Sequence, residues 1–253
     1  MNRVRTVLVS AVSLAAASAL IVAAGRMGRE QPPHAWSSVA GASEYGWRRL
    51  ALMPDTRYEA AAAVVEGRLY VFGGFRYDGG QPARRTVARF DPSVDRWERR
   101  TYLPRPVTHA NAAVDGQAVW LVGGFIGDHP GVATDETWKY DTSTNAWPAG
   151  PPLPTARAGG VLARVGRALH YVGVSLPDRR TSASDHWVLA LDSAAGWRPA
   201  TPLPVARGHA GGAVIDGRLY VVGGAIGHDA DPRDTSLVSV YDPATDTWRD
   251  AAD

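Results

Sequence analysis

Cysteine is absent from the 253 residues of this chain, so neither a disulfide framework nor lipid attachment through a cysteine can form. Lysine is almost absent as well, because Lys139 is the only one, and arginine supplies nearly all the basic charge. The formal net charge is only +2, and the arginines alternate with acidic residues instead of gathering in one stretch. This distribution predicts no nucleic-acid partner, which would require basic groups on one face. The chain also lacks a serine nucleophile elbow, a phosphate loop and a zinc signature.

Long hydrophobic runs are absent except for one near the amino terminus. A short basic head, Met1 to Arg5, precedes an uncharged apolar run from Thr6 to Gly25, and together they are typical of an export signal. Two interpretations stay open. Cleavage after Ala24 would make the protein periplasmic or secreted, whereas an uncleaved segment would anchor it to the cytoplasmic membrane, facing outside. Export without cysteine favours a bacterial envelope.

The remaining chain begins with a linker and continues as a repeat. Residues 26–45 have the composition of a flexible linker, and residues 1–25 are the export segment. Three landmarks then recur about every 50 residues: Leu-Pro or Met-Pro at 53, 103, 153 and 203, Gly-Gly (Gly-Val in the third copy) at 73, 123, 173 and 223, and Trp at 47, 97, 147, 197 and 248. Such a period marks an array of similar units, here about 53–102, 103–152, 153–202 and 203–253.

Each repeat has the pattern of four antiparallel strands, which the fourth copy shows best. A small apolar run from His209 to Ile215 predicts strand a, Asp216-Gly217 predicts a tight turn, and Arg218 to Val222 predicts strand b. Strand c follows at Leu237 to Tyr241, and strand d opens at Thr247. The other copies place the end of strand c at Phe90, Tyr140 and Leu191. Sheets of this kind must stack to cover their faces, as the blades of a β-propeller do.

These residues resemble the Kelch repeat family, in which an Arg precedes strand a, Gly-Gly follows strand b, Tyr-Asp follows strand c and Trp lies in strand d. The resemblance covers residues 46–253 and implies an all-β, Kelch-type β-propeller with four complete four-stranded blades and almost no helix. Trp47 implies an additional orphan strand before the first blade. Because Kelch propellers have five to seven blades, the ring is either an incomplete one, with open ends that favour self-association, or a closed ring of four.

Strand direction predicts where a ligand binds. The connections from strand d to strand a and from strand b to strand c open on the same face. The first set of connections carries Arg57, Arg105, Arg157 and Arg207, and strand a carries His109 and His209. The second set adds Tyr77, Asp78, Arg84, Arg85, Asp128, His129, Asp178, Arg179, Arg180, His228, Asp229 and Asp231. Guanidinium groups around a mouth suit carboxylates or acidic sugars. The alternative is that each Arg braces a turn of its own blade, and that the two histidines are structural.

Three functions fit this pattern unequally. The preferred one is a non-enzymatic module that binds a carbohydrate or a protein ligand, with no cofactor and no metal. The alternative is a sugar mutarotase or epimerase resembling N-acetylneuraminate epimerase, an isomerase that shuttles protons between an acid and a base. An oxidase resembling galactose oxidase is excluded, because that family uses a cysteine-modified tyrosine and this chain has no cysteine.

Overall fold

The computed structural model describes residues 48–77, 80–229 and 231–251. The predicted export segment, the linker, Trp47 and Asp78 lie outside the described residues. The described part contains strands and turns but no helix, and therefore none that is long and apolar enough to cross a bilayer.

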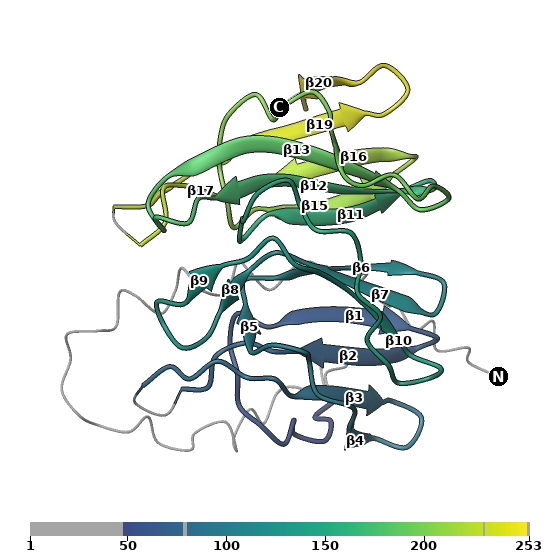
Figure 1. The fold of residues 1–253 in the computed structure, drawn as a ribbon. Helices are drawn as coiled ribbons and strands as arrows, with labels where there is room; N and C mark the ends of the chain where they lie inside the picture. The colour runs from purple at the N-terminus through teal and green to yellow at the C-terminus, as the bar shows by residue number, and fades with distance from the viewer. Residues whose placement is uncertain (1–47, 78–79, 230, 252–253) are drawn as a thin grey trace.

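Four antiparallel sheets follow one another along the chain, from blue to yellow in Figure 1. Blade 1 consists of β1 (Ala61–Val65), β2 (Arg68–Phe72), β3 (Val87–Asp91) and β4 (Arg96–Arg99), and blade 2 of β6 (Asn111–Asp115), β7 (Ala118–Val122) and β10 (Thr137–Asp141). Blade 3 consists of β11 (Val161–Val165), β12 (Ala168–Ser175), β13 (Ser182–Ala190) and β14 (Arg198–Pro199), and blade 4 of β15 (Gly211–Ile215), β16 (Arg218–Val222), β19 (Val238–Asp242) and β20 (Thr247–Asp250). The predicted all-β propeller architecture is confirmed.

The connections on one face pair into small sheets of their own. One contains β5 (Val107–Thr108), β8 (Phe125–Ile126) and β9 (Val132–Ala133), and the other contains β17 (Ala225–Ile226) and β18 (Arg233–Asp234). These sheets hold the long loops after the second strand of blades 2 and 4 against the start of each blade.

The strand predictions are confirmed except near the ends. The second strand of blade 4 matches the predicted bounds, whereas its inner strand begins two residues later. The third strands of all four blades end one residue away from the prediction. The fourth strand of blade 2 is reduced to isolated bridges at Ala146 and Ala149. Pro148 lies between them and has no amide hydrogen to donate to Lys139, although its carbonyl accepts one from that residue.

Blade 3 departs from its neighbours where its sequence has Gly-Val in place of Gly-Gly. In the other blades both glycines after the second strand have a positive φ and the strand stops there. In blade 3 Val174 stands for the second glycine, and β12 continues through it to Ser175, with a register shift between Val172 and Val174. An L-residue with a branched Cβ prefers the extended backbone, so the strand does not turn away.

The connections that lead into blades 1, 3 and 4 are held by a repeated contact of the tryptophan in or next to the fourth strand. The indole nitrogens of Trp97, Trp197 and Trp248 donate to the carbonyls of Ala51, Pro151 and Thr201, at 2.9, 3.0 and 2.9 Å. Each acceptor lies in the connection that leads into a blade. An orphan strand was predicted before blade 1, but residues 48–52 form no strand. They are a segment that docks on blade 1 through Ala51.

Three apolar clusters fill the spaces between neighbouring blades. The surface of blade 4 that is not packed against blade 3 has exposed apolar side chains. There Val214, Ile215 and Val222 are 40%, 51% and 46% exposed. The inner strands of blades 1 to 3 contain mainly buried or half-buried apolar residues. The described residues thus form an arc with apolar side chains at its blade 4 end.

A buried histidine pair joins blades 3 and 4. His170 in β12 and His186 in β13 lie 2.9 Å apart through Nδ1 and Nε2, and both rings pack on Tyr241. Nδ1 of His186 donates to the carbonyl of Thr201, so its Nε2 accepts the hydrogen bond from His170. Burial lowers the pKa of His170 to about 3, assisted by repulsion from His186, and lowers that of His186 to about 4.

We predict that this pair makes the fold sensitive to mild acid. Below pH 6.5 the unfolded chain takes up protons on both histidines, whereas the folded protein does not. Lowering the pH from 7 to 5 therefore reduces the free energy of unfolding by about 2 kcal/mol per histidine. The variant His170→Asn keeps a donor near Nδ1 but does not titrate. Urea unfolding at pH 7, 6 and 5 should give a shallower slope for the variant, and equal slopes would contradict the assignment.

Candidate functional site

One residue in each blade occupies the same place beside the propeller axis, two positions before the innermost strand. These residues are Glu59, His109, Gly159 and His209, and each has a positive φ, between 51° and 65°. Their backbones are hydrogen-bonded in series. His109 donates to the carbonyl of Glu59 (3.4 Å), Gly159 to that of His109 (2.9 Å), and His209 to that of Gly159 (3.0 Å). This series brings residues from all four blades together.

The glycine in this series lies directly against a histidine of the next blade. A Cβ added at Gly159 would be in van der Waals contact with the ring of His209, 3.4 Å from its Cε1. The sequence places His109 and His209 at the same repeat position, and their ring centroids are 5.2 Å apart, edge to face.

Glu59 and His109 form a close buried pair. Nε2 of His109 lies 2.6 Å from a carboxylate oxygen of Glu59, and Nδ1 of His109 lies 2.9 Å from the hydroxyl of Thr108. Burial opposes ionisation of Glu59, but the contact with His109 and the nearby histidines together hold its pKa below the ordinary value. A carboxylate here can orient the imidazole or exchange a proton with it.

His228 enters the same place from the loop after β17. Its Nδ1 lies 2.5 Å from Oδ1 of Asp229, and both ring nitrogens are buried without a partner in hydrogen-bond geometry. The ring centroid is 4.5 Å from that of His209 and 5.2 Å from that of His109. Three predicted site residues are thereby brought together. One nitrogen from each of His109, His209 and His228 lies within 4.8 Å of the others.

Arg179 ties the loops of three blades around these histidines. Its guanidinium donates to both carboxylate oxygens of Asp229, at 2.5 and 3.2 Å, and to the carbonyl of Pro130 at 2.6 Å. The same group lies 4.0 Å from the centroid of Phe125. Burial opposes ionisation of Asp229, but the hydrogen bond and the charge of Arg179, with the contact of His228, hold its pKa below the ordinary value.

The remaining histidines in this group are neutral at physiological pH. Burial lowers the pKa of His209 to about 3 and that of His228 to about 4, and repulsion from His109 adds to both effects. Neutral imidazoles next to ionised carboxylates can accept protons or coordinate a cation, which the charged forms cannot do. We call Glu59, His109, Arg179, His209, His228 and Asp229 the axial cluster.

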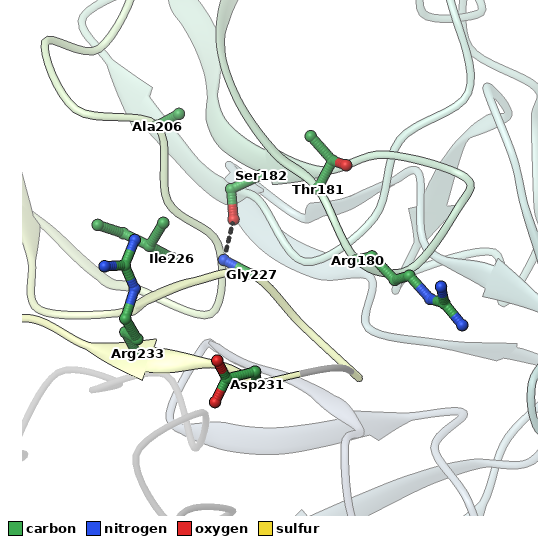
Figure 2. Close-up of a pocket in the computed structure, with 8 residues that line it drawn as sticks. All are labelled: Arg180, Thr181, Ser182, Ala206, Ile226, Gly227, Asp231 and Arg233. Carbon is green, nitrogen blue, oxygen red and sulfur yellow. Dashed lines mark hydrogen bonds between the residues drawn. The ribbon is translucent and has the colours of Figure 1, made fainter.

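A depression of about 490 Å³ opens beside the axial cluster, and we call it the loop pocket. It is lined by Arg180, Thr181, Ser182, Ala206, Ile226, Gly227, Asp231 and Arg233. Figure 2 shows Arg233 beside Ile226 and Arg180 on the other side, with the hydrogen bond from Gly227 to Ser182 Oγ (3.0 Å) between them. Neither guanidinium makes an ion pair within the described residues, so both can receive an anion.

The arginines that precede the inner strands do not form an open rim. Arg207 is fully buried and donates to the carbonyls of Gly223, Val205 and Val221 and to the hydroxyl of Ser239, at 2.9 to 3.2 Å.

The equivalent arginines of blades 1 and 3 have similar contacts. Arg57 donates to the carbonyls of Gly73 and Thr86, and Arg157 pairs with Asp185 at 2.8 Å. These are the contacts of braces within a blade. Ligand binding by the three arginines stays a prediction, one that their present contacts do not favour.

Three other predicted residues lie outside the axial cluster. Arg105 is paired with Glu136 on the surface at 3.2 Å. Asp128 accepts the amide of Ala83 at 2.8 Å, and the ring of His129 packs against that of Phe75. Both join the loops of blades 1 and 2.

Sequence reasoning missed Glu59 and Arg233 as site residues. The signal for Glu59 was present, since it lies 50 residues before His109 and 150 before His209. Arg233 gave no signal, because its loop has no counterpart of the same length and composition in the other blades.

The sequence and the fold both have known counterparts. Two models of the Kelch motif match the chain, one over residues 56–104 and the other over residues 106–154 and 206–253. The interval between the last two ranges is the third repeat, which departs from the pattern at Val174. The solved structure titled "Structure of YjhT" is similar, with a TM-score of 0.71 and 15% identity over 81% of this chain and 74% of that one, a likeness of fold. No curated protein matches the sequence.

We predict that Arg207 acts on stability. Arg207→Met keeps the buried stem but leaves three carbonyls without their donor, and should lower the free energy of unfolding by about 3 kcal/mol. Arg105→Met on the surface should change it by less than about 0.5 kcal/mol. Urea unfolding of both variants measures the difference. An Arg207→Met protein as stable as the unaltered chain would show that the guanidinium does not stabilise blade 4.

Proposed function

The chain belongs to the Kelch repeat family, and from this premise we propose that it is a binding module that holds a carbohydrate or another acidic ligand in the loop pocket. The observation that carries the proposal is the placement of Arg180 and Arg233 on either side of Ser182 without an intramolecular ion pair. A volume of about 490 Å³ is in the range of small-molecule sites. Guanidinium groups bind carboxylates through paired hydrogen bonds.

The location of the pocket supports the same proposal. Arg180 follows Arg179 in the chain, and Gly227 precedes His228, so the two loops that line the pocket also build the axial cluster. The bonds between Arg179 and Asp229 hold both loops together. A ligand in the pocket would therefore meet a surface that is already organised, which reduces the entropy lost on binding.

We expect a hexuronic acid to bind more tightly than the matching neutral hexose. Calorimetric titration measures both, and Arg233→Gln should weaken binding of the acid at least tenfold by removing a charge-assisted contact. Arg218→Gln is the control, because Arg218 is paired with Asp242 at the first turn of blade 4, on the opposite face. Equal effects of the two substitutions, or equal affinity for acid and neutral sugar, would refute the proposal.

A second candidate is a sugar mutarotase, an isomerase. The contact of Glu59 with His109 favours it, because a carboxylate and an imidazole can supply the base and the acid that sugar ring opening requires. The same samples distinguish the two functions when followed by nuclear magnetic resonance. Exchange between sugar anomers that is accelerated by the protein, and is lost in Glu59→Gln, would assign the isomerase.

The binding module would act outside the cytoplasmic membrane. The apolar run from Thr6 to Gly25 behind its basic head supports export. A reporter enzyme that is active only outside the cytoplasm, fused after Ala24, should be active. The matched control replaces two apolar residues of the run, Leu14 and Val22, with arginine and should abolish the signal. An inactive reporter beside a stable fusion protein would exclude export.

A further inference from the structure

The axial cluster contains more nitrogen and oxygen donors than packing of four blades requires. We propose that the imidazoles of His109, His209 and His228 bind one divalent transition-metal ion, with zinc as the best match. This inference does not depend on the proposed function, because none of the three histidines lines the loop pocket.

The geometry meets the first condition for such a site. One nitrogen from each ring lies within 4.8 Å of the other two. Zinc holds imidazole nitrogens at about 2.0 to 2.1 Å, so tetrahedral ligands lie about 3.4 Å apart, and the rings need to approach by about 1.4 Å at most. In the proposed site, rotation of the side chains about χ1 and χ2 would supply this approach.

The groups behind the rings meet the second condition. Nδ1 of His228 lies 2.5 Å from Asp229, which leaves its Nε2 buried and without a hydrogen-bond partner. Nδ1 of His109 lies against the hydroxyl of Thr108, which leaves Nε2 for the ion or for Glu59. Metal-binding histidines usually have their second nitrogen held in this way by a carboxylate or an oxygen atom.

Charge meets the third condition. The axial cluster has two carboxylates, Glu59 and Asp229, and one guanidinium, Arg179, around the three imidazoles, so a cation would compensate a net negative charge. Glu59 touches Nε2 of His109 and can exchange this contact for one with the ion, which would make it a fourth ligand. Imidazole nitrogens select zinc and its neighbours in the first transition row over calcium and magnesium, which prefer oxygen.

The site would also connect parts of the arc that are not neighbours. His109 belongs to blade 2, whereas His209 and His228 belong to blade 4, and the glycine of blade 3 lies between them. An ion held by these residues would couple blade 2 to blade 4 across the axis. Binding should therefore raise the melting temperature of the folded protein.

The test is a titration of the full chain, without a histidine tag and after treatment with a chelator, with Zn²⁺ and with Co²⁺. We expect one ion per chain, and a visible absorption band of Co²⁺ typical of nitrogen ligands in a four-coordinate site. Zn²⁺ should raise the melting temperature, whereas Ca²⁺ and Mg²⁺ should not. The substitutions His209→Ala and His228→Gln should each weaken Zn²⁺ binding at least 100-fold, and Glu59→Gln about tenfold.

Two matched controls separate this site from adventitious binding. His129→Ala removes a histidine from the same face, and His170→Asn removes a buried one between blades 3 and 4, and both should bind Zn²⁺ as the unaltered chain does. His228→Gln changes a loop residue and keeps the result readable should His209→Ala fail to fold. Equal Zn²⁺ affinity of the unaltered chain and His228→Gln, or a stoichiometry that falls in the controls, would overturn the proposal.

Discussion

The series of backbone hydrogen bonds at the axis is the constraint on which the rest of this structure depends. Each link joins the residue two positions before one inner strand to the same residue of the next blade, from Glu59 to His209. The links require a left-handed backbone, which costs a residue with a side chain about 1 kcal/mol or more. Three of the four residues have side chains, so contacts made at the axis must offset this cost.

A second set of contacts spaces the blades at their junctions. The amides of Gly74 and Gly124 donate to the carbonyls of Val107 and Arg157 in the next blade, each at 2.9 Å. A Cβ at Gly123 would lie against the carbonyl of Arg157, so only glycine permits this approach. This explains why the arginines stand where they do. The carbonyl of Arg157 receives the preceding blade, while its guanidinium pairs with Asp185 in its own blade. The guanidinium groups of Arg57 and Arg207 bind carbonyls at the end of their own second strands, Gly73 and Gly223.

The sequence predicted most of the fold because its signals are local and repeated. Turn residues such as Asp216-Gly217 and the alternation of apolar residues define strands without reference to the rest of the chain. The prediction was wrong at Ala146 to Ala149, where Pro148 removes an amide that the pattern of tryptophans does not report. The start of the inner strands was also predicted too early, because the left-handed residue His209 was assigned to the strand that it precedes.

The candidate site was only partly predictable, since it depends on where loops of unequal length meet. The common repeat position of His109 and His209 pointed to the axis, and their rings do lie together. Nothing in the repeat places His228 beside them, or Arg179 on Asp229, because these loops fold against other blades. The arginines before the inner strands were predicted to bind a ligand, because charged residues at the opening of a propeller often do. A sequence does not show the backbone carbonyls that Arg207 binds instead.

The axial cluster is not explained by packing alone. Blade 3 occupies its axial position with glycine, against which the ring of His209 from blade 4 lies, so the fold does not need a polar group at every blade. Burying Glu59, Arg179 and three imidazoles costs free energy that apolar residues of similar size would avoid. Their carboxylates nevertheless have charged or imidazole neighbours, but both ring nitrogens of His228 lack a partner in hydrogen-bond geometry. Such groups are costly to bury, and some of them lack a hydrogen-bond partner. This combination is typical of a site that binds a ligand or an ion.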